Sequence, residues 1–273
     1  MDVRSLVLFG QKSLNNITDT PRLESELLLS YVLKKEREKI LVSLTKDVSL
    51  ADEENFKLLI KKRQSGYPFS YITNHKAFMG LDFFVREGVL IPRPETEMLV
   101  EEAIKISNWE EKYILDIGTG TGCIILSFLY YNHKSSGLGV DISDIANKTA
   151  KKNALQFNLS DRVNFACRDY RELTFDEEFD IVVSNPPYVK KENCKNLYFE
   201  PVNALDGGSD GFNFYPSLIE KSYKFLRGKG VLIIEIDDGM EHTIMNEMKK
   251  TGYKDIKILK DLAGFYRIAE GAK

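Results

Sequence analysis

Cysteine and histidine are scarce in this chain of 273 residues, which contains three of each. The cysteines form no CxxC pair and lie far apart, so we expect no disulfide framework and a reducing, cytoplasmic environment. The histidines have no metal-ligand spacing with one another or with a cysteine, so we expect no metal. These residues are Cys123, Cys167, Cys194, His75, His133 and His242.

Long apolar runs and an excess of basic residues are also missing. No stretch approaches the ~18 uncharged apolar residues that a membrane-spanning helix needs. Residues 1–11 carry Asp2 and Arg4 and lack the apolar core of a signal peptide. The formal net charge is −3 and the pI is near 5.8, whereas a protein that binds nucleic acid usually has a basic excess. We therefore expect neither a membrane nor a stable nucleic-acid partner.

The composition predicts a folded protein, because 43% of the residues are hydrophobic and 29% are charged. Residues 1–75 have helical periodicity without strand-like alternation, which predicts a small helical domain. Thr20 followed by Pro21 predicts the start of one helix in this domain. Ser49 and Asp52 predict a capping box at the start of another.

Residues 76–92 change period and predict a link between two domains. Their hydrophobic residues are arranged around Gly80 and Gly88, a pattern that indicates a pair of strands with turns, and we expect a β-hairpin linker. A second domain is expected over 93–273, beginning with a proline-rich segment and a helix through Ile106.

Strand and helix patterns alternate from residue 112 onward, which predicts an α/β fold with a parallel sheet covered on both faces. Only residues 261–263 separate the last two strands, too few for a crossover, so these strands must be antiparallel. A doubly wound sheet of this kind resembles the Rossmann-like fold of class I methyltransferases. The strands are expected at 112–117, 136–141, 162–167, 179–184, 230–236, 254–260 and 264–269. The helices are expected at 122–132, 143–157, 213–227 and 240–251.

A glycine-rich turn over 118–122 joins the first of these strands to a helix, and it brings backbone N–H groups against a ligand. It is not a P-loop, because no Lys-Ser/Thr follows, and Cys123 replaces the third glycine of the dinucleotide pattern. With Asp116 before it, the turn resembles the S-adenosylmethionine loop, in which Asp116 fixes the loop or, through water, the ligand's amino group. The alternative is a turn used only for packing. The candidate cofactor residues here are Asp116, Gly118, Thr119, Gly120, Thr121 and Gly122.

Further candidates for the cofactor site stand where the next two strands are expected to end. Asp141 follows the loop by about 20 residues, the spacing at which an acid accepts from ribose hydroxyls. The alternative role is a helix N-cap, which Ser143 or Asp144 would fill equally well. Asp169 is placed to accept from an adenine amino group, and Tyr170 to lie on the adenine ring.

The strongest signal is Asn185-Pro186-Pro187-Tyr188, which ends an apolar strand. The prolines donate no backbone hydrogen bond, so a stiff turn holds their carbonyls as acceptors. This suits a planar NH₂ group: the oxygens of Asn185 and Pro186 accept its hydrogens and stabilise positive charge as a methyl group arrives. Tyr188 stacks on the planar group, and Asn185 also lies beside the methyl donor. The predicted catalytic residues are Asn185, Pro186 and Tyr188, and Pro187 joins them in binding the substrate.

The tetrapeptide alone does not choose among adenine, guanine and glutamine amide as substrate, and a proline-rich loop without chemistry is the other alternative. Other segments are more specific. Residues 90–97, LIPRPETE, resemble the signature of the bacterial peptide chain release factor glutamine N5-methyltransferases, the PrmC/HemK family. Residues 66–72 are similar to that family's GxPxxYI, 200–215 to its EPxxAL-GGxDGxxxY stretch, and 261–267 to its closing DLxGxxR.

The resemblance implies a helical substrate-recognition domain, a hairpin linker and a methyltransferase domain. It implies that S-adenosyl-L-methionine donates a methyl group to N5 of the glutamine in the Gly-Gly-Gln motif of class I release factors, leaving S-adenosyl-L-homocysteine. It also implies that residues 118–122, Asp141, Tyr170 and Asn185 contact the cofactor and that residues 185–188 hold the glutamine.

Three departures from the family pattern stand beside this resemblance. Tyr170 replaces a common tryptophan, residues 235–239 lack the usual glycine pair and glutamine, and the loop from Tyr188 to Glu200 is short. Three rival functions are also open. A DNA or RNA amino-methyltransferase is disfavoured by the acidic pI. The intact tetrapeptide disfavours a non-catalytic cofactor-binding module, and the missing third glycine disfavours a dehydrogenase.

Overall fold

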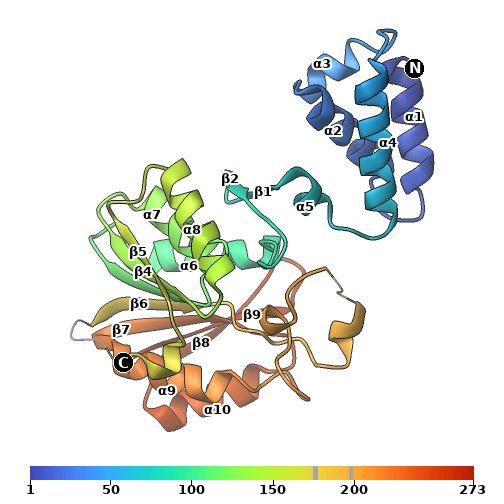
Figure 1. Ribbon diagram of the computed structural model, residues 1–273. Coiled ribbons are helices and arrows are strands. Elements are labelled where there is room, and N and C mark those ends of the chain that lie inside the picture. Colours follow the sequence, from blue (N-terminus) through green and yellow to red (C-terminus); the bar gives the residue numbers. More distant parts are fainter. Residues whose placement is uncertain (175–177, 197–198) are drawn as a thin grey trace. The chain divides into compact units, whose positions relative to one another are not determined.

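A computed structural model describes residues 1–174, 178–196 and 199–273 (Figure 1). The chain divides into two compact units, Met1–His75 and Lys76–Lys273. None of the helices within the described residues combines the length and the apolarity needed to cross a membrane.

The first unit is helical and packs around one small core. Its helices are α1 (Val3–Leu14), α2 (Pro21–Leu33), α3 (Arg37–Leu41), α4 (Leu50–Gln64) and α5 (Phe69–Thr73). α1, α2 and α4 contact one another and bury Leu6, Leu28 and Phe56 completely. A Cβ on Gly10 would lie 2.2 Å from Oγ of Ser25, so glycine lets α1 and α2 approach closely.

Two helices of this unit begin where the sequence predicts, although their caps differ from the prediction. Thr20 precedes α2, but its side chain makes no cap hydrogen bond with the described residues, so Pro21 starts the helix through its fixed φ. At α4, Oγ of Ser49 accepts from the Asp52 N–H at 3.1 Å. The Asp52 carboxylate accepts from the Ser49 hydroxyl, not from the Ser49 backbone, so the capping box is one-sided.

Three basic residues of α4 have partners within the helical unit. Nε of Arg63 donates to Glu24 at 2.7 Å, and Nζ of Lys57 donates to Glu53 at 2.6 Å. Nζ of Lys62 lies 3.9 Å from the ring centroid of Tyr67. These contacts favour a structural role for this side of the helix over an open basic patch.

A hairpin of β1 (His75–Phe78) and β2 (Leu81–Phe84) follows. Its turn residues Met79 and Gly80 have φ values of 51° and 67°, the left-handed conformation that suits a tight hairpin. The strand pair expected within 76–92 is present but shorter than expected, because β2 ends at Phe84 and residues 85–92 form turns and a loop. Val85 and Val89 are buried although they lie outside the strands, so burial accounts for the strand-like pattern there.

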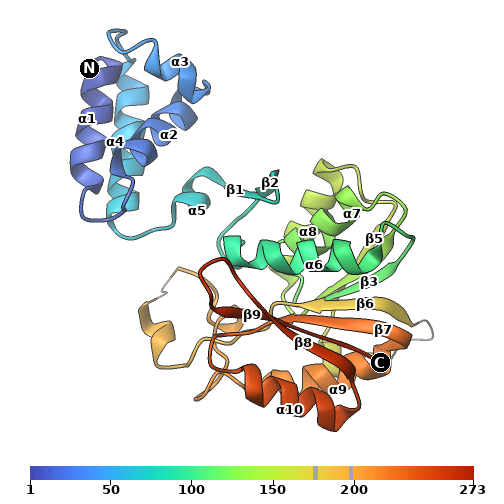
Figure 2. The same ribbon diagram turned by 180° about the vertical axis from the view of Figure 1, so that it is seen from behind.

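The second unit is built on a sheet of seven strands in the order β5-β4-β3-β6-β7-β9-β8 (Figures 1 and 2). β3, β4, β5, β6 and β7 are parallel, and β9 runs antiparallel to both β7 and β8. The predicted α/β fold with a final antiparallel pair is therefore confirmed. The strands are β3 (Tyr113–Ile117), β4 (Ser136–Asp141), β5 (Val163–Cys167), β6 (Phe179–Ser184), β7 (Leu226–Glu235), β8 (Lys254–Lys260) and β9 (Tyr266–Ala272).

Helices cover both faces of this sheet, as Figures 1 and 2 show. One face carries α6 (Glu97–Ser107), α7 (Cys123–Tyr131) and α8 (Asp144–Gln156), and the other carries α9 (Tyr215–Phe225) and α10 (Glu241–Thr251). Successive residues of β3 point to opposite faces, so Ile114 joins the first core and Leu115 the second. Short 3₁₀ turns occur at η1 (Pro94–Thr96), η2 (Tyr170–Glu172), η3 (Asn193–Asn196) and η4 (Val202–Ala204).

Candidate active site

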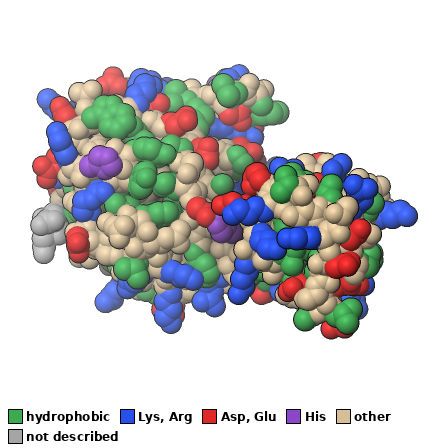
Figure 3. Space-filling view, turned by 90° about the horizontal axis from the view of Figure 1, so that it is seen from above, with side chains coloured by type: hydrophobic (Ala, Val, Ile, Leu, Met, Phe, Trp, Pro, Cys, Tyr) green, Lys and Arg blue, Asp and Glu red, His purple; other side chains and the backbone are tan. Residues whose placement is uncertain are grey.

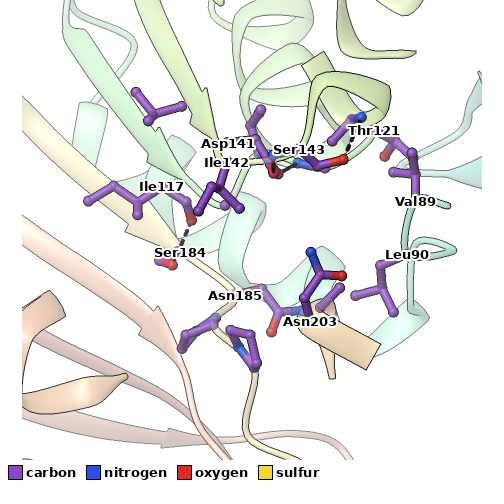
Figure 4. A pocket seen from close by; sticks show the side chains of 18 of the residues that line it. Val89, Leu90, Ile117, Thr121, Asp141, Ile142, Ser143, Ser184, Asn185 and Asn203 are labelled. Atoms are coloured by element: carbon purple, nitrogen blue, oxygen red, sulfur yellow. Dashed lines mark hydrogen bonds between the residues drawn. The ribbon is translucent and has the colours of Figure 1, made fainter. Parts of the chain in front are cut away.

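A pocket opens at the carboxyl ends of β3, β4 and β6, where doubly wound sheets bind ligands. It contains about 1160 Å³ of empty space, part of which is open solvent. Loops from distant parts of the second unit form its walls (Figure 4). Residues that line it include Leu90, Gly118, Asp141, Tyr170, Asn185 and Asn203.

The glycine turn forms one wall of the pocket. Gly118, Gly120 and Gly122 have φ values of 75°, 55° and 79°, a conformation that glycine adopts without steric cost. The N–H groups of Gly118 and Thr119 donate to the carbonyl of Val140 at 2.8 and 3.1 Å, which ties the turn to β4. A Cβ on Gly118 would meet nothing within 4 Å, so the backbone itself faces open space there.

Asp116 lies beneath this turn and is fully buried. Its Oδ2 accepts from Oγ1 of Thr119 at 2.7 Å. Burial raises the pKa of Asp116 to about 7, and the negative charge of Asp141 adds to the rise while the bond from Thr119 opposes it. Of the two roles expected for Asp116, the structure shows contact with the loop.

The two threonines of the turn also direct their side chains into the protein. Thr119 and Thr121 are only 3% and 2% exposed. The carbonyl of Thr121 accepts from Nδ2 of Asn153 on α8 at 2.8 Å, which fixes the second half of the turn. The surface that this turn offers to a ligand is therefore mainly backbone.

Asp141 ends β4 and connects the glycine turn with α8. Its Oδ2 accepts from the Gly120 N–H at 2.9 Å and its Oδ1 from the Ser143 N–H at 2.8 Å (Figure 4). Burial raises the pKa of Asp141, and these two bonds oppose the rise. The N-cap of α8 is Ser143, whose Oγ accepts from the Ala146 N–H at 3.3 Å, so the structure gives the capping role to Ser143.

Asp169 and Tyr170 follow β5 in the sequence and line the pocket. The hydroxyl of Tyr170 shares a hydrogen bond of 2.6 Å with Oγ of Ser217, which orients its ring. The Asp169 carboxylate accepts from the backbone N–H of Arg171 at 2.9 Å and from its guanidinium, and the bond from the guanidinium lowers the pKa of Asp169. The sequence did not predict this partner, and the role of Asp169 toward adenine stays a prediction.

The tetrapeptide follows β6 and supplies the wall opposite Asp141. Asn185, Pro186 and Pro187 line the pocket, and Nδ2 of Asn185 donates to Oγ1 of Thr96 at 3.0 Å. The hydroxyl of Tyr188 donates to Oε1 of Glu235 at 3.0 Å. Stacking of Tyr188 on a substrate remains a prediction.

Residues 207–211 pack against the backbone of the tetrapeptide. The N–H of Val189 donates to the Leu205 carbonyl at 2.9 Å, and the N–H of Gly207 donates to the Val189 carbonyl at 2.8 Å. A Cβ on Gly207 would lie 2.7 Å from Cα of Tyr188, so only glycine allows this approach. The glycine-rich stretch therefore holds the turn in place. The loop just before it includes residues 197 and 198, which lie outside the described residues.

A buried acid joins two loops at the rim of the pocket. Oε1 of Glu200 accepts from the Ile91 N–H at 3.0 Å, and its Oε2 pairs with the guanidinium of Arg93. The next residues reach the pocket, where Figure 4 shows the carboxamide of Asn203 extending toward the same space as Asn185.

Known proteins resemble the chain over both units. Residues 6–73 match the family PrmC N-terminal domain, and residues 94–203 match the family methyltransferase small domain. The chain is 36% identical over 260 residues to the release factor glutamine methyltransferase of Clostridium botulinum, covering 92% of each chain. It is 38% identical over 255 residues to that of Clostridium acetobutylicum, covering 90% of this chain and 89% of the relative.

The chain belongs to the release factor glutamine methyltransferase family. The resemblance seen in the motifs and the methyltransferase class are thereby confirmed. A solved methyltransferase from Pyrococcus furiosus shares the fold, with 20% identity and a TM-score of 0.55, over 81% of this chain and 98% of that one.

Several site residues of this family member were not predicted from its sequence. Thr96, Glu200 and Glu235 each bond to the walls of the pocket, and Asn203 lines it. Thr96 and Glu200 stand inside the motifs that carried the resemblance, so those motifs were the available signal. Glu235 is an acid at the end of an apolar strand, the same pattern that drew attention to Asp141.

Proposed function

We propose that this protein transfers the methyl group of S-adenosyl-L-methionine to N5 of the glutamine in the Gly-Gly-Gln motif of class I release factors. Membership of the release factor glutamine methyltransferase family supports the substrate. The observation that supports the chemistry best is the hydrogen bond from Nδ2 of Asn185 to Oγ1 of Thr96, which would leave the carboxamide oxygen to accept from a ligand in the pocket.

The residues present fit S-adenosyl-L-methionine. The open backbone at Gly118 leaves room for a ligand against the loop, and the Asp141 carboxylate beside it retains lone pairs for a ribose diol. Residues 118–122, Asp141, Asp169 and Tyr170 would hold the cofactor, and Asn185 would lie near its methyl group. When bound, this cofactor supplies an electrophilic methyl group carried on a sulfonium.

The chain's own contribution is to orient a weak nucleophile. The lone pair of an amide nitrogen is delocalised, so the nitrogen reacts only if it is aimed and if its growing positive charge is stabilised. Oδ1 of Asn185 and the carbonyl of Pro186 would accept the two hydrogens of the glutamine NH₂. No side-chain base is needed, because the departing proton becomes acidic as the new bond forms.

The helical unit, residues 1–75, would help to recognise the release factor. A single glutamine offers few contacts, whereas a protein substrate needs a docking surface beyond the site. The match of residues 6–73 to the PrmC N-terminal domain supports this assignment.

A nucleic-acid substrate is the main competing candidate. On the face of the described residues drawn in Figure 3, Lys and Arg side chains are interspersed with Asp and Glu. Mixed charge of this kind favours a protein substrate over a polyanion.

The direct test offers tritiated S-adenosyl-L-methionine with release factor, DNA and RNA in parallel. We expect label in the release factor only, and none when the Gly-Gly-Gln glutamine is replaced by glutamate. Label in nucleic acid, or label that survives the replacement, would overturn the proposal. Asn185→Ala should lower kcat by ~10²–10³-fold, as expected for loss of one preorganised partner. Calorimetry should show a smaller effect on cofactor affinity.

A further inference from the structure

A buried chain of hydrogen bonds runs from β7 to the pocket. Glu235 is only 1% exposed, and a buried acid needs bonded partners. Its Oε2 accepts from Oγ1 of Thr96 at 2.6 Å and its Oε1 from the Tyr188 hydroxyl at 3.0 Å. Oγ1 of Thr96 in turn accepts from Nδ2 of Asn185 at 3.0 Å.

The direction of these bonds is dictated by the donors available. An ionised carboxylate only accepts, and a hydroxyl has a single hydrogen to give. Because Thr96 gives its hydrogen to Glu235, it offers only lone pairs to Asn185. The carboxamide must then present its NH₂ to Thr96, and its oxygen remains for the pocket.

We infer that Glu235 and Thr96 are positioning residues, which hold the Asn185 carboxamide with its oxygen toward the substrate NH₂. The inference rests on the proposed function, since it explains how the amide acceptor of that reaction keeps its orientation. The two ends of a carboxamide are nearly equal in shape, so packing alone selects neither one. Reversal would place an NH₂ group against the substrate NH₂ and remove the acceptor.

The groups around Glu235 shift its pKa in both directions. Burial raises the pKa of Glu235, and the nearby charge of Glu95 adds to the rise. The hydrogen bonds from Thr96 and Tyr188 and the charge of Arg267 oppose it. The same bonds that orient the amide therefore also favour the ionised carboxylate.

Thr96→Val is the sharpest test, because it keeps the shape and removes the hydroxyl. We expect kcat on release factor to fall by about 10- to 100-fold, the cost of a slightly misplaced reacting group. KM for release factor and the affinity for S-adenosyl-L-methionine should change by no more than about threefold, because the residue acts on orientation and not on uniform binding. Thr96→Ser should recover most of the loss, since serine supplies the same hydroxyl.

Glu235→Gln tests the direction of the hydrogen bonds from Glu235 to Asn185 without a change in side-chain volume. The glutamine NH₂ would donate to Thr96, whose hydrogen would then be free to point at Asn185 and favour the reversed amide. We expect a loss of kcat similar to that of Thr96→Val. Thr149→Val is the matched control, because Thr149 is another buried threonine whose Oγ1 donates to a carbonyl, that of Ile145 at 2.8 Å. Its kcat should equal that of the wild type.

A double substitution tests whether Thr96 affects catalysis through Asn185. In an Asn185→Ala background, Thr96→Val should cause no further loss, because the group that it positions is already gone. The side-chain amide signal of Asn185 in a ¹⁵N NMR spectrum, assigned by its disappearance in Asn185→Ala, should shift in Thr96→Val and return in Thr96→Ser. This second readout does not depend on turnover.

Two results would overturn the inference. One is a wild-type kcat in Thr96→Val, and the other is an equal further loss when this change is added to Asn185→Ala. Failure of the wild type to label release factor would instead overturn the proposed function, so the two failures are distinguishable.

Discussion

At the scale of single residues, Asp141 holds the glycine turn and also faces the space assigned to the ribose. Asp141→Ala removes the acceptor for Gly120 and Ser143 together with the charge beside the ligand. Each charge-assisted bond is worth ~1.5–3 kcal/mol, so calorimetry should show affinity for S-adenosyl-L-methionine reduced by about tenfold or more. Asp144→Ala is the control, because Asp144 pairs with Lys148 on the exposed surface of α8. Equal affinities in the two variants would remove Asp141 from the cofactor site.

The raised pKa of Asp116 predicts that the stability of the protein depends on pH. Its pKa is raised from the ordinary 3.8 to about 7, so between these values the folded protein binds a proton that the unfolded chain releases. The free energy of unfolding that Asp116 contributes therefore falls as the pH rises through this window. Asp116→Asn cannot ionise and still offers an oxygen to Thr119.

Urea unfolding of both proteins between pH 4 and pH 8 measures this contribution. The variant should gain stability relative to the wild type as the pH rises, by on the order of 4 kcal/mol over the whole window. Stability curves that run parallel in pH would show that Asp116 does not titrate in this range.

At the scale of elements, residues 207–211 pack against the tetrapeptide. We expect that disturbing this packing lowers kcat but leaves cofactor binding unchanged. Gly207→Ala would place a Cβ 2.7 Å from Cα of Tyr188 and 2.8 Å from the Pro187 carbonyl, so the turn must move. We expect kcat to fall by about 100-fold, as for a reacting group misplaced by ~1 Å, with little change in cofactor affinity. Gly228→Ala is the matched control, since a Cβ there meets nothing within 4 Å. Full activity of Gly207→Ala would mean that this contact does not position the turn.

The elements were predictable where a local pattern decides them. Apolar runs bounded by turns located the strands of the sheet, and the short connection at 261–263 required an antiparallel pair. The pattern failed at 85–92, because Val85 and Val89 are buried although they lie outside the strands. Buried residues in a loop and residues of a half-buried strand produce the same alternation of apolar and polar residues in a sequence.

The site was predictable only in part, for a related reason. Asn185 could be recognised from the tetrapeptide, but its partner Thr96 lies 89 positions away. Thr96 in turn bonds to Glu235 across 139 positions. No local periodicity reports contacts at such separations, so the orientation of the Asn185 amide had to come from the structure.

At the scale of the whole molecule, the two compact units predict separable functions. A chain beginning at His75 keeps β1 intact and removes α1–α5. We expect its KM for intact release factor to rise by about tenfold or more, because the docking surface is lost. Its affinity for S-adenosyl-L-methionine should stay within about twofold, since the described residues that line the pocket all belong to the second unit.

A short peptide containing Gly-Gly-Gln provides the control for this truncation. Such a peptide engages the site without the rest of the release factor, so both chains should methylate it at similar rates. Equal KM values for the intact release factor would exclude the helical unit from recognition.

The place of β9 in the sheet has a consequence for how the enzyme is made. β9 follows β8 in the chain but lies between β7 and β8, so during synthesis β7 keeps an unpaired edge until β8 and β9 have both emerged. Glu235 stands opposite Ile268 in that pairing. Glu235 is the last residue of β7, so we expect its position to be fixed only after β9 has paired with β7.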